Sequence, residues 1–272
     1  MAAIVFGIIF LVIAVIVFLV QTLSTKKHLE QLTSSGRQKL GEILGAYRET
    51  KKELGEMGEE NTVSEKLTVM GNPSCDEPLT SPLGQKPCVY YEVKVTANRV
   101  ERYQERDSNG NMQNRTRNVT DTLDHSTNST RFKLDDGTDT VIVDPRDGQF
   151  DGLVTTVDRS EVHQPGAGPT LSFGGFSLTL PNASSLANQP PQTIHYEEKI
   201  IGLDRKLTVV GTLCDKMGEL LIEKSGKTKV IVSTKSPDEM LAETESAMKR
   251  QRIIMIACGA IGLILLIVGI VT

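Results

Sequence analysis

The chain has 272 residues, a net charge of −4 at pH 7 and no tryptophan. It has neither the excess of basic residues nor the stacking aromatics with which proteins bind nucleic acid, so we expect no nucleic-acid partner. Its four cysteines have no paired spacing, which argues against a disulfide scaffold and favours a reducing compartment.

Two stretches without a charged residue lie near the two ends of the sequence, at residues 2–23 and 253–271. About 20 apolar residues cross the hydrocarbon core of a bilayer as a helix, so we predict transmembrane helices 1 and 2 here. The first stretch lacks the basic start and the small-residue cleavage site of a signal peptide. It therefore indicates an anchor, and the chain is predicted to be an integral membrane protein.

Basic residues flank both predicted spans on their inner sides. Lys26 and Lys27 follow the first span, and Lys249, Arg250 and Arg252 precede the second. Because Lys and Arg near span ends favour the cytoplasmic side, we expect the central domain to be cytoplasmic and both termini to lie outside. In a prokaryote the membrane would be the cell membrane.

Residues 24–60 are predicted to form a helical stalk. Leu40, Ile43, Leu44 and Tyr47 recur at the spacing of one helical face. Four glycines weaken the helix, each by about 1 kcal/mol relative to alanine. We expect the apolar face to pack on the protein's own domain, and the alternative is a coiled-coil surface for a partner.

Residues 61–235 are predicted to form a mostly β domain, a small barrel or sandwich. Residues 66–71, Lys-Leu-Thr-Val-Met-Gly, recur almost unchanged at 206–211, which predicts two equivalent strands with Leu and Val facing inward. Asn109-Gly110 is a strong hairpin signal. Further short strands with polar turns between them favour a barrel or sandwich; they are predicted at 89–103, 112–123, 131–134, 140–143, 171–173, 176–180, 220–223 and 229–233, the last two as a hairpin.

A proline-rich turn opens the second strand of this domain. Prolines fix φ, and the aromatic and β-branched residues that follow favour a strand. The candidate interaction or signature residues are Pro78, Leu79, Ser81, Pro82, Leu83, Cys88, Tyr90 and Tyr91. Composition alone favours an ordinary loop before an ordinary strand.

Residues 236–252 are predicted to form a juxtamembrane helix. Ser236 is a capping residue, Pro237 suits the first turn, and Asp238 and Glu239 complement the positive end of the helix dipole. No helix breaker follows before Gly259, so we expect this helix to continue into the second span.

The sequence gives little support to metal or cofactor chemistry. The four histidines are scattered, no Cys-x-x-Cys occurs, and the acidic run from Asp135 to Asp151 lacks calcium-loop spacing. We expect no metal and no cofactor. Cys88 is a candidate nucleophile if a histidine lies nearby in the fold, although a small buried cysteine is the commoner case.

The proline-rich turn resembles the signature of the GIDE or BAM (beside-a-membrane) domain, found in membrane-anchored mitochondrial RING-type E3 ubiquitin ligases and their prokaryotic relatives. The resemblance extends through residues 132–138, 141–145, 196–198 and 207–211, over about residues 62–240. The chain departs from the family in having no tryptophan and no RING finger, so it is similar to a prokaryotic-type member. In the mitochondrial relatives the domain lies in the intermembrane space, which differs from the side that the charges predict here.

The resemblance implies E3 ubiquitin-protein transferase activity, but the zinc ligands of a RING are absent from these residues. We therefore expect a membrane-adjacent interaction or sensing module with a protein partner. The alternatives are ubiquitin transfer with a RING partner, and a Cys-dependent hydrolase.

Overall fold

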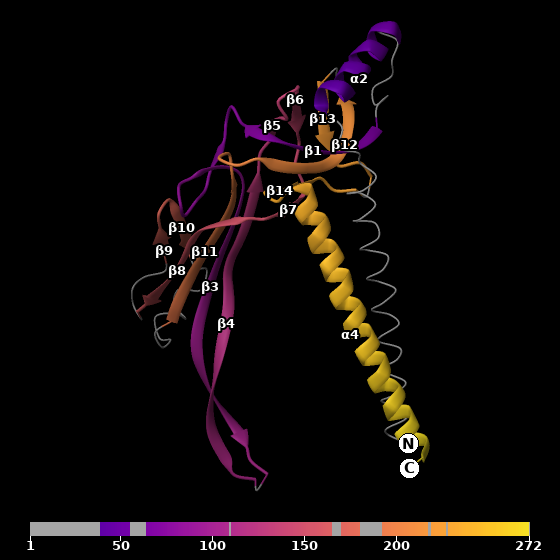
Figure 1. Ribbon diagram of the computed structural model, residues 1–272. Coiled ribbons are helices and arrows are strands. Elements are labelled where there is room, and N and C mark those ends of the chain that lie inside the picture. Colours follow the sequence, from indigo (N-terminus) through magenta and orange to yellow (C-terminus); the bar gives the residue numbers. More distant parts are fainter. Residues whose placement is uncertain are drawn as a thin grey trace.

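The computed structural model describes residues 39–54, 64–108, 110–164, 170–179, 192–216, 219–226 and 228–271. Two layers of β-structure lie beside a long C-terminal helix (Figure 1). The elements are α2 (Leu40–Leu54), β1 (Ser64–Ser74), β2 (Leu79–Thr80), β3 (Pro87–Arg106), β4 (Met112–Ser129), β5 (Phe132–Asp135), β6 (Thr140–Val143), β7 (Gln149–Asp151), β8 (Val154–His163), β9 (Thr170–Phe173), β10 (Phe176–Thr179), β11 (Gln192–Gly202), β12 (Leu207–Lys216), β13 (Glu219–Glu223), β14 (Ile231–Ser233) and α4 (Pro237–Val271).

Five strands close into a barrel in the order β1-β5-β6-β13-β12, and β12 pairs back to β1. All neighbours are antiparallel except β6 and β13, which are parallel. This strand order, with its one parallel pair, is that of the OB-fold, a five-stranded Greek-key barrel. Of the two predicted architectures, a small barrel or a sandwich, the structure has the barrel. A fold alone does not determine a protein's function.

The two near-identical segments pair with each other across the barrel seam. Val69 lies opposite Val209, and each segment's leucine lies opposite the other's glycine, Leu67 against Gly211 and Leu207 against Gly71. Both leucines and both valines are at most 3% exposed and belong to the barrel core. The prediction that these strands contribute inward Leu and Val residues is confirmed.

Helix α2 packs its apolar face on the barrel. Leu40 and Leu44 are buried in the barrel core, and Ile43 packs against it. The Asp136 carboxylate accepts the Leu40 backbone N–H at 2.8 Å and so satisfies one of the helix's first free donors. The expected packing of this face on the protein's own domain is confirmed; the rest of the predicted stalk lies outside the described residues.

A second sheet carries the order β2-β3-β11-β8, with β4 on β3. The β9–β10 hairpin lies against this sheet and shares a small core with it, formed by buried residues such as Val93, Val95 and Ile194 and by the partly buried Phe173 and Phe176. The strands predicted at 171–173 and 176–180 are confirmed over Thr170–Phe173 and Phe176–Thr179, and they pair as a hairpin.

Beyond this sheet, β3 and β4 continue alone as a two-stranded ribbon. The last residue of β3 that pairs with β11 is Asn98, whereas pairing with β4 runs on to Arg106 opposite Met112. Gly110 at the tip has φ +85, a conformation that glycine adopts at little cost. The hairpin prediction is confirmed, with strands longer than expected.

Helix α4 runs without a break over 35 residues. Ser236 and Glu239 form a capping box, in which the Ser236 N–H donates to the Glu239 carboxylate at 2.8 Å and the Glu239 N–H donates to Ser236 Oγ at 3.3 Å. The predicted cap and continuous helix are confirmed. Over the residues described, no helix combines the length and the hydrophobicity that crossing a membrane requires, and residues 2–23 fall outside them.

One predicted pairing is wrong. Strands β13 and β14 do not form a hairpin with each other: both pair with β12, β13 along residues 212–216 and β14 along 208–210. Strand β12 has ten residues, so one edge accommodates two short strands end to end. Strands β7, β8 and β11 were not predicted.

Candidate functional site

The proline-rich segment forms a tight turn that is tied to itself. The Ser81 N–H donates to the Lys86 carbonyl at 2.9 Å, and the Gln85 N–H donates to the Ser81 carbonyl at 3.0 Å. The buried Ser81 hydroxyl accepts the Lys86 N–H at 3.0 Å. Gln85 has φ 52, the left-handed region in which the chain reverses direction.

A buried carboxylate binds this turn from β11. Glu198 is 0% exposed, and its oxygens accept the Leu83 N–H at 2.6 Å, the Gly84 N–H at 3.0 Å and the Thr156 hydroxyl at 2.5 Å. Three donors compensate the cost of burying the charge. A Cβ at Gly84 would lie 2.7 Å from the Glu198 carboxylate, so the close approach requires glycine there.

The β9–β10 turn closes over the other side of the same segment. The Gly175 N–H donates to the Pro82 carbonyl at 3.1 Å. Gly174 has φ +58, and a Cβ there would lie 2.4 Å from the Leu83 carbonyl oxygen. The turn is thus held between β11 and β8 on one side and the β9–β10 hairpin on the other. The side of the turn that faces them therefore has a structural role.

The sequence-predicted site residues divide between the interior and the surface. Pro78 is exposed, and Leu79, Pro82 and Tyr91 are half-buried. The buried members of the set are Ser81, Leu83, Cys88 and Tyr90. The structure brings all of them together at the start of β3. Pro78 and the neighbouring Thr80, Gln85, Lys86 and Pro87 are open to solvent.

Cys88 is placed as a buried small residue. Its side chain is 0% exposed, and its thiol donates to the Leu79 carbonyl at 3.6 Å. Burial raises the pKa of Cys88 to about 11, and the charge of Glu198 adds to the rise. A nucleophilic cysteine needs a lowered pKa, so this environment gives the hydrolase alternative no support.

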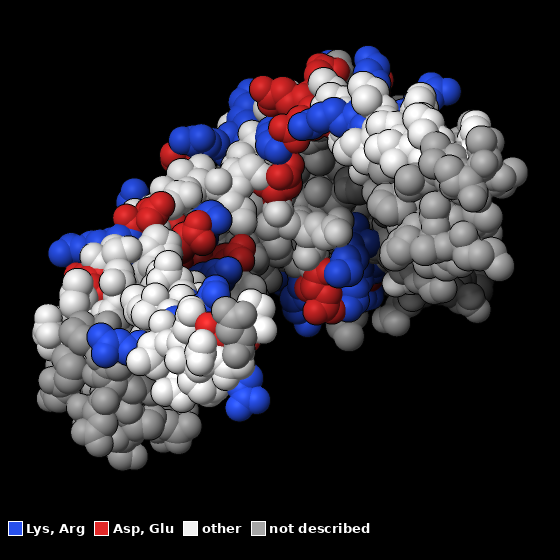
Figure 2. Space-filling view, turned by 90° about the horizontal axis from the view of Figure 1, so that it is seen from below, with Lys and Arg blue, Asp and Glu red and all other residues white. Residues whose placement is uncertain are grey.

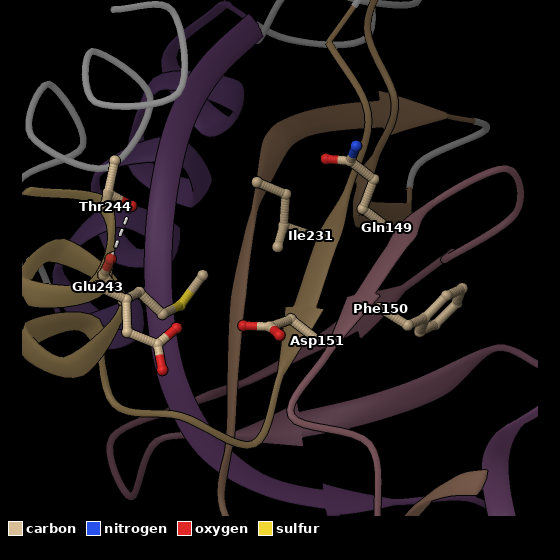
Figure 3. Close-up of a pocket in the computed structure, with 7 residues that line it drawn as sticks. Gln149, Phe150, Asp151, Ile231, Glu243 and Thr244 are labelled. Atoms are coloured by element: carbon tan, nitrogen blue, oxygen red, sulfur yellow. Dashed lines mark hydrogen bonds between the residues drawn. The ribbon is translucent and has the colours of Figure 1, made fainter. Parts of the chain in front are cut away.

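A pocket of about 380 Å³ lies where α4 leaves the barrel. It is lined by Gln149, Phe150 and Asp151 of β7, Ile231 of β14, and Met240, Glu243 and Thr244 of α4. In Figure 3 the Asp151 and Glu243 side chains point toward one another from the strand and the helix. The lining combines apolar side chains with two carboxylates and includes neither histidine nor cysteine.

Lys235 joins the two sides of this pocket. Its Nζ lies 3.1 Å from Asp151 Oδ2 and 2.6 Å from Glu243 Oε2. The hydrogen bond to Glu243 is the main cause that raises the pKa of Lys235, and Asp151 adds to it. Phe150 stacks on Tyr90, with ring centroids 3.7 Å apart, which links β7 to the start of β3. Together these contacts fix the root of α4 on the barrel.

Asp144 makes the other concentrated charge contact of the barrel. It is 3% exposed and is bound by Arg131 at 2.8 Å and Arg146 at 2.6 Å. Burial alone raises its pKa, but the hydrogen bonds from the two arginines outweigh burial and hold the pKa below the ordinary value of 3.8. Asp135 and Asp136 accept backbone N–H groups within the β5–β6 turn, from Gly137 at 2.7 Å and Thr138 at 2.8 Å.

Metal ligands do not gather at any of these places: in the part of the chain that the structure describes, no three His, Cys, Asp or Glu side chains are grouped so as to hold an ion. Basic and acidic side chains are interspersed over the face seen in Figure 2. Cys75, Cys88 and Cys214 are free thiols.

Sequence reasoning missed Glu198 and the Lys235 contacts. A signal for Glu198 existed, because it falls in phase with Ile194, Tyr196 and Ile200 on the buried side of β11. A carboxylate at that position requires buried donors. Two of the three donors are backbone groups of a distant turn, which no pattern in the sequence pairs with β11.

The chain matches the family model GIDE, described as E3 Ubiquitin ligase, over residues 100–269. This is more than half of the chain, and it begins after the proline-rich turn. Neither a curated protein nor a solved structure matches the chain.

Proposed function

We propose, from the premise that this chain belongs to the GIDE family, that it is a membrane-anchored protein whose β-domain acts as an interaction or sensing module beside the membrane. The observation that carries the proposal is helix α4, which is fixed to the barrel at its first turns and then extends away from it (Figure 1).

The last part of α4 has an apolar surface, and none of the described residues packs over it. Six isoleucines are at least 50% exposed, namely Ile253, Ile254, Ile256, Ile261, Ile264 and Ile267. Residues 253–271 contain no charged side chain. Large apolar surfaces of this kind mark protein or membrane contacts, and the length suits a bilayer core.

The charges next to this stretch support an orientation. Lys249, Arg250 and Arg252 lie one turn before Ile253 on the same continuous helix. Basic residues at span ends favour the cytoplasmic side. The proposed arrangement therefore places the β-domain in the cytoplasm, with residues 2–23 as a second anchor and both termini on the far side.

Two groups that could act in catalysis, the Cys88 thiol and the Glu198 carboxylate, are both buried, which supports a role in binding. The buried Cys88 thiol has a raised pKa, and the Glu198 carboxylate is occupied by three donors. The signature turn thus builds the joint between two sheets and leaves surface elements to make contacts.

Cysteine labelling in intact cells tests this proposal. The native cysteines are replaced, and single cysteines are introduced by Ala3→Cys, Ser108→Cys and Thr272→Cys in the full chain. We expect an impermeant maleimide to label the two terminal variants and to label Ser108→Cys only after permeabilisation. Labelling of Ser108→Cys alone in intact cells, or release of the chain from membranes by alkaline carbonate, would contradict it.

Ubiquitin transfer is a second candidate, favoured by the description of the matching family. A RING holds two zinc ions with about eight Cys and His ligands at close spacing, and these 272 residues contain four of each, dispersed. Transfer would therefore draw on a zinc module from elsewhere. Discharge of a ubiquitin-loaded conjugating enzyme by the purified chain, with and without a RING protein, measures this directly; we expect none by the chain alone.

A further inference from the structure

The two faces of the projecting ribbon differ in how their charges are neutralised. We define the distal ribbon as residues 99–106 of β3 and 112–119 of β4. On one face, Glu101 pairs with Arg117 at 2.7 Å, and Glu105 pairs with Arg115 at 2.9 Å. The Arg117 guanidinium also lies 5.5 Å from the Tyr103 ring centroid. Arg99 on this face pairs with Asp121 at 2.9 Å, just below the ribbon, so each arginine of the first face has an acidic partner.

The second face carries positive charge without balance. The residues on it are Val100, Arg102, Gln104 and Arg106 with their cross-strand neighbours Asn118, Thr116, Asn114 and Met112. All are exposed, and none is acidic. Within the described residues, neither Arg102 nor Arg106 has an ion-pair partner. Val100 and Met112 are 52% and 58% exposed. The two arginines therefore share this face with two exposed apolar side chains.

The β3–β4 ribbon and helix α4 both project from the barrel, and the ribbon projects further than the part of α4 that precedes residue 253. Tyr90 on β3 stacks on Phe150, which lines the same pocket as Met240 on α4, so both projections start at one level. From Tyr90 to Arg106 the strand rises about 53 Å, whereas from Met240 to Arg252 the helix rises only about 18 Å. Both extend to the same side of the barrel (Figure 1). A bilayer that holds residues 253–271 therefore meets the ribbon.

The ribbon cannot enter that bilayer, because its arginines and glutamates are costly in hydrocarbon. It has to lean until one face rests on the headgroups. We propose that the second face of the distal ribbon, with Arg102, Arg106 and Met112, docks on anionic lipid headgroups of the membrane that holds α4. This rests on the proposed membrane anchoring.

An anionic lipid surface fits this face better than nucleic acid does. Two arginines and two apolar groups without an aromatic platform match a headgroup layer, where each basic residue contributes about 1 kcal/mol of attraction. Neutralising both arginines should therefore lower the docking equilibrium constant by about 30-fold, from two contributions of about 1 kcal/mol. Because both arginines are exposed, salt should screen their attraction to the headgroups.

The test uses the full chain, its native cysteines replaced and a fluorophore attached through Ser108→Cys at the ribbon tip. The chain is reconstituted in nanodiscs of neutral phosphatidylcholine, or of phosphatidylcholine with about one third phosphatidylglycerol. A lipid with a nitroxide on its headgroup quenches the fluorophore when the ribbon docks. We expect quenching in the anionic discs, little in the neutral discs, and loss of the difference at high salt.

Two double variants locate the effect on one face. Arg102→Gln with Arg106→Gln should abolish the anionic-dependent quenching, whereas Arg115→Gln with Arg117→Gln removes equal charge from the opposite face and should retain it. Equal loss in both pairs, or equal quenching in neutral and anionic discs, overturns the docking. If the chains incorporate into the discs but the label is not quenched, the docking is wrong and the anchoring is unaffected. Chains that fail to co-elute with either disc overturn the anchoring and the docking with it.

Discussion

The barrel and the distal ribbon are both antiparallel β-structure, but they are held together in different ways. In β12, nine of ten residues are buried, and the barrel is stabilised by a core shared among five strands. In β4 no residue is fully buried, and the ribbon depends on cross-strand ion pairs and polar contacts. Strand β3 links the two, because Val89 and Tyr90 near its start pack in the barrel core, whereas its residues 99–106 are half-buried or exposed.

This contrast shows that strand pairing alone does not determine stability here. An isolated two-stranded ribbon is marginal in water, so the distal ribbon persists because the second sheet anchors its base. Substitutions in the barrel should therefore affect global unfolding, and substitutions in the ribbon should act locally.

The largest expected effect is that of an unpaired charge in the barrel core. Val209→Asp should destabilise the protein by about 4 kcal/mol or more, because the carboxylate has no donor in an apolar core. Thermal unfolding of the full chain in detergent measures it. Val100→Asp in the ribbon is the matched control and should leave the midpoint nearly unchanged. An equal fall in both would show that the ribbon and barrel unfold as one unit.

The joint between the two regions should respond next. Glu198→Gln turns an amide N–H₂ toward the Leu83 or Gly84 N–H, and should cost about 2–3 kcal/mol. Hydrogen exchange should accelerate at residues 81–86. Glu197→Gln is the control, since Glu197 is paired only with the half-exposed Lys199. Unchanged exchange in Glu198→Gln would mean that the turn holds its shape without the carboxylate.

The buried charge contact of the barrel predicts a dependence on pH. The pKa of Asp144 is lower in the folded state than its ordinary value of 3.8, so its contribution is complete above about pH 4 and is lost as the pH falls through the folded pKa. Asp144→Asn should cost about 1–2 kcal/mol at pH 7, and less at pH 3. Urea midpoints at both pH values measure this; an equal cost at both would place the effect in packing instead of charge.

The smallest effect is expected for the corresponding pair on the ribbon. Glu101 and Arg117 are 35% and 61% exposed, and exposed pairs contribute about 0.2–1 kcal/mol. A double-mutant cycle with Glu101→Gln and Arg117→Gln should give a coupling of about 0.5 kcal/mol or less. A coupling above 1 kcal/mol would show that the ribbon is stabilised by charge to the same degree as the barrel.

The sequence predicted the barrel better than it predicted the joints. The repeated Leu-Thr-Val pattern at 66–71 and 206–211 correctly indicated inward Leu67 and Val209, because period-two alternation is local. The Asn-Gly tip and the Ser236 cap were predicted for the same reason. The pairing of β13 and β14 with β12 was not, since neighbours in a sheet depend on the whole barrel.

The candidate site was predicted only in outline. The proline-rich turn was located, but its binding to Glu198 joins residues 115 apart in the sequence. The contacts of Lys235 with Asp151 and Glu243 likewise depend on the angle at which α4 leaves the barrel. Such contacts follow from tertiary geometry and leave no periodic signal.

The pairing of β1 with β12 also has a consequence for the order of events during synthesis. The two strands lie about 140 residues apart, which a ribosome takes on the order of ten seconds to translate. During that interval the edge of β1 that β12 will cover remains open. Because the two segments are nearly identical and Leu lies opposite Gly in their pairing, β1 of one nascent chain is a suitable partner for β1 of its neighbour. Dense polysomes would therefore favour β1-to-β1 association of nascent chains, and slow translation before β12 would increase it.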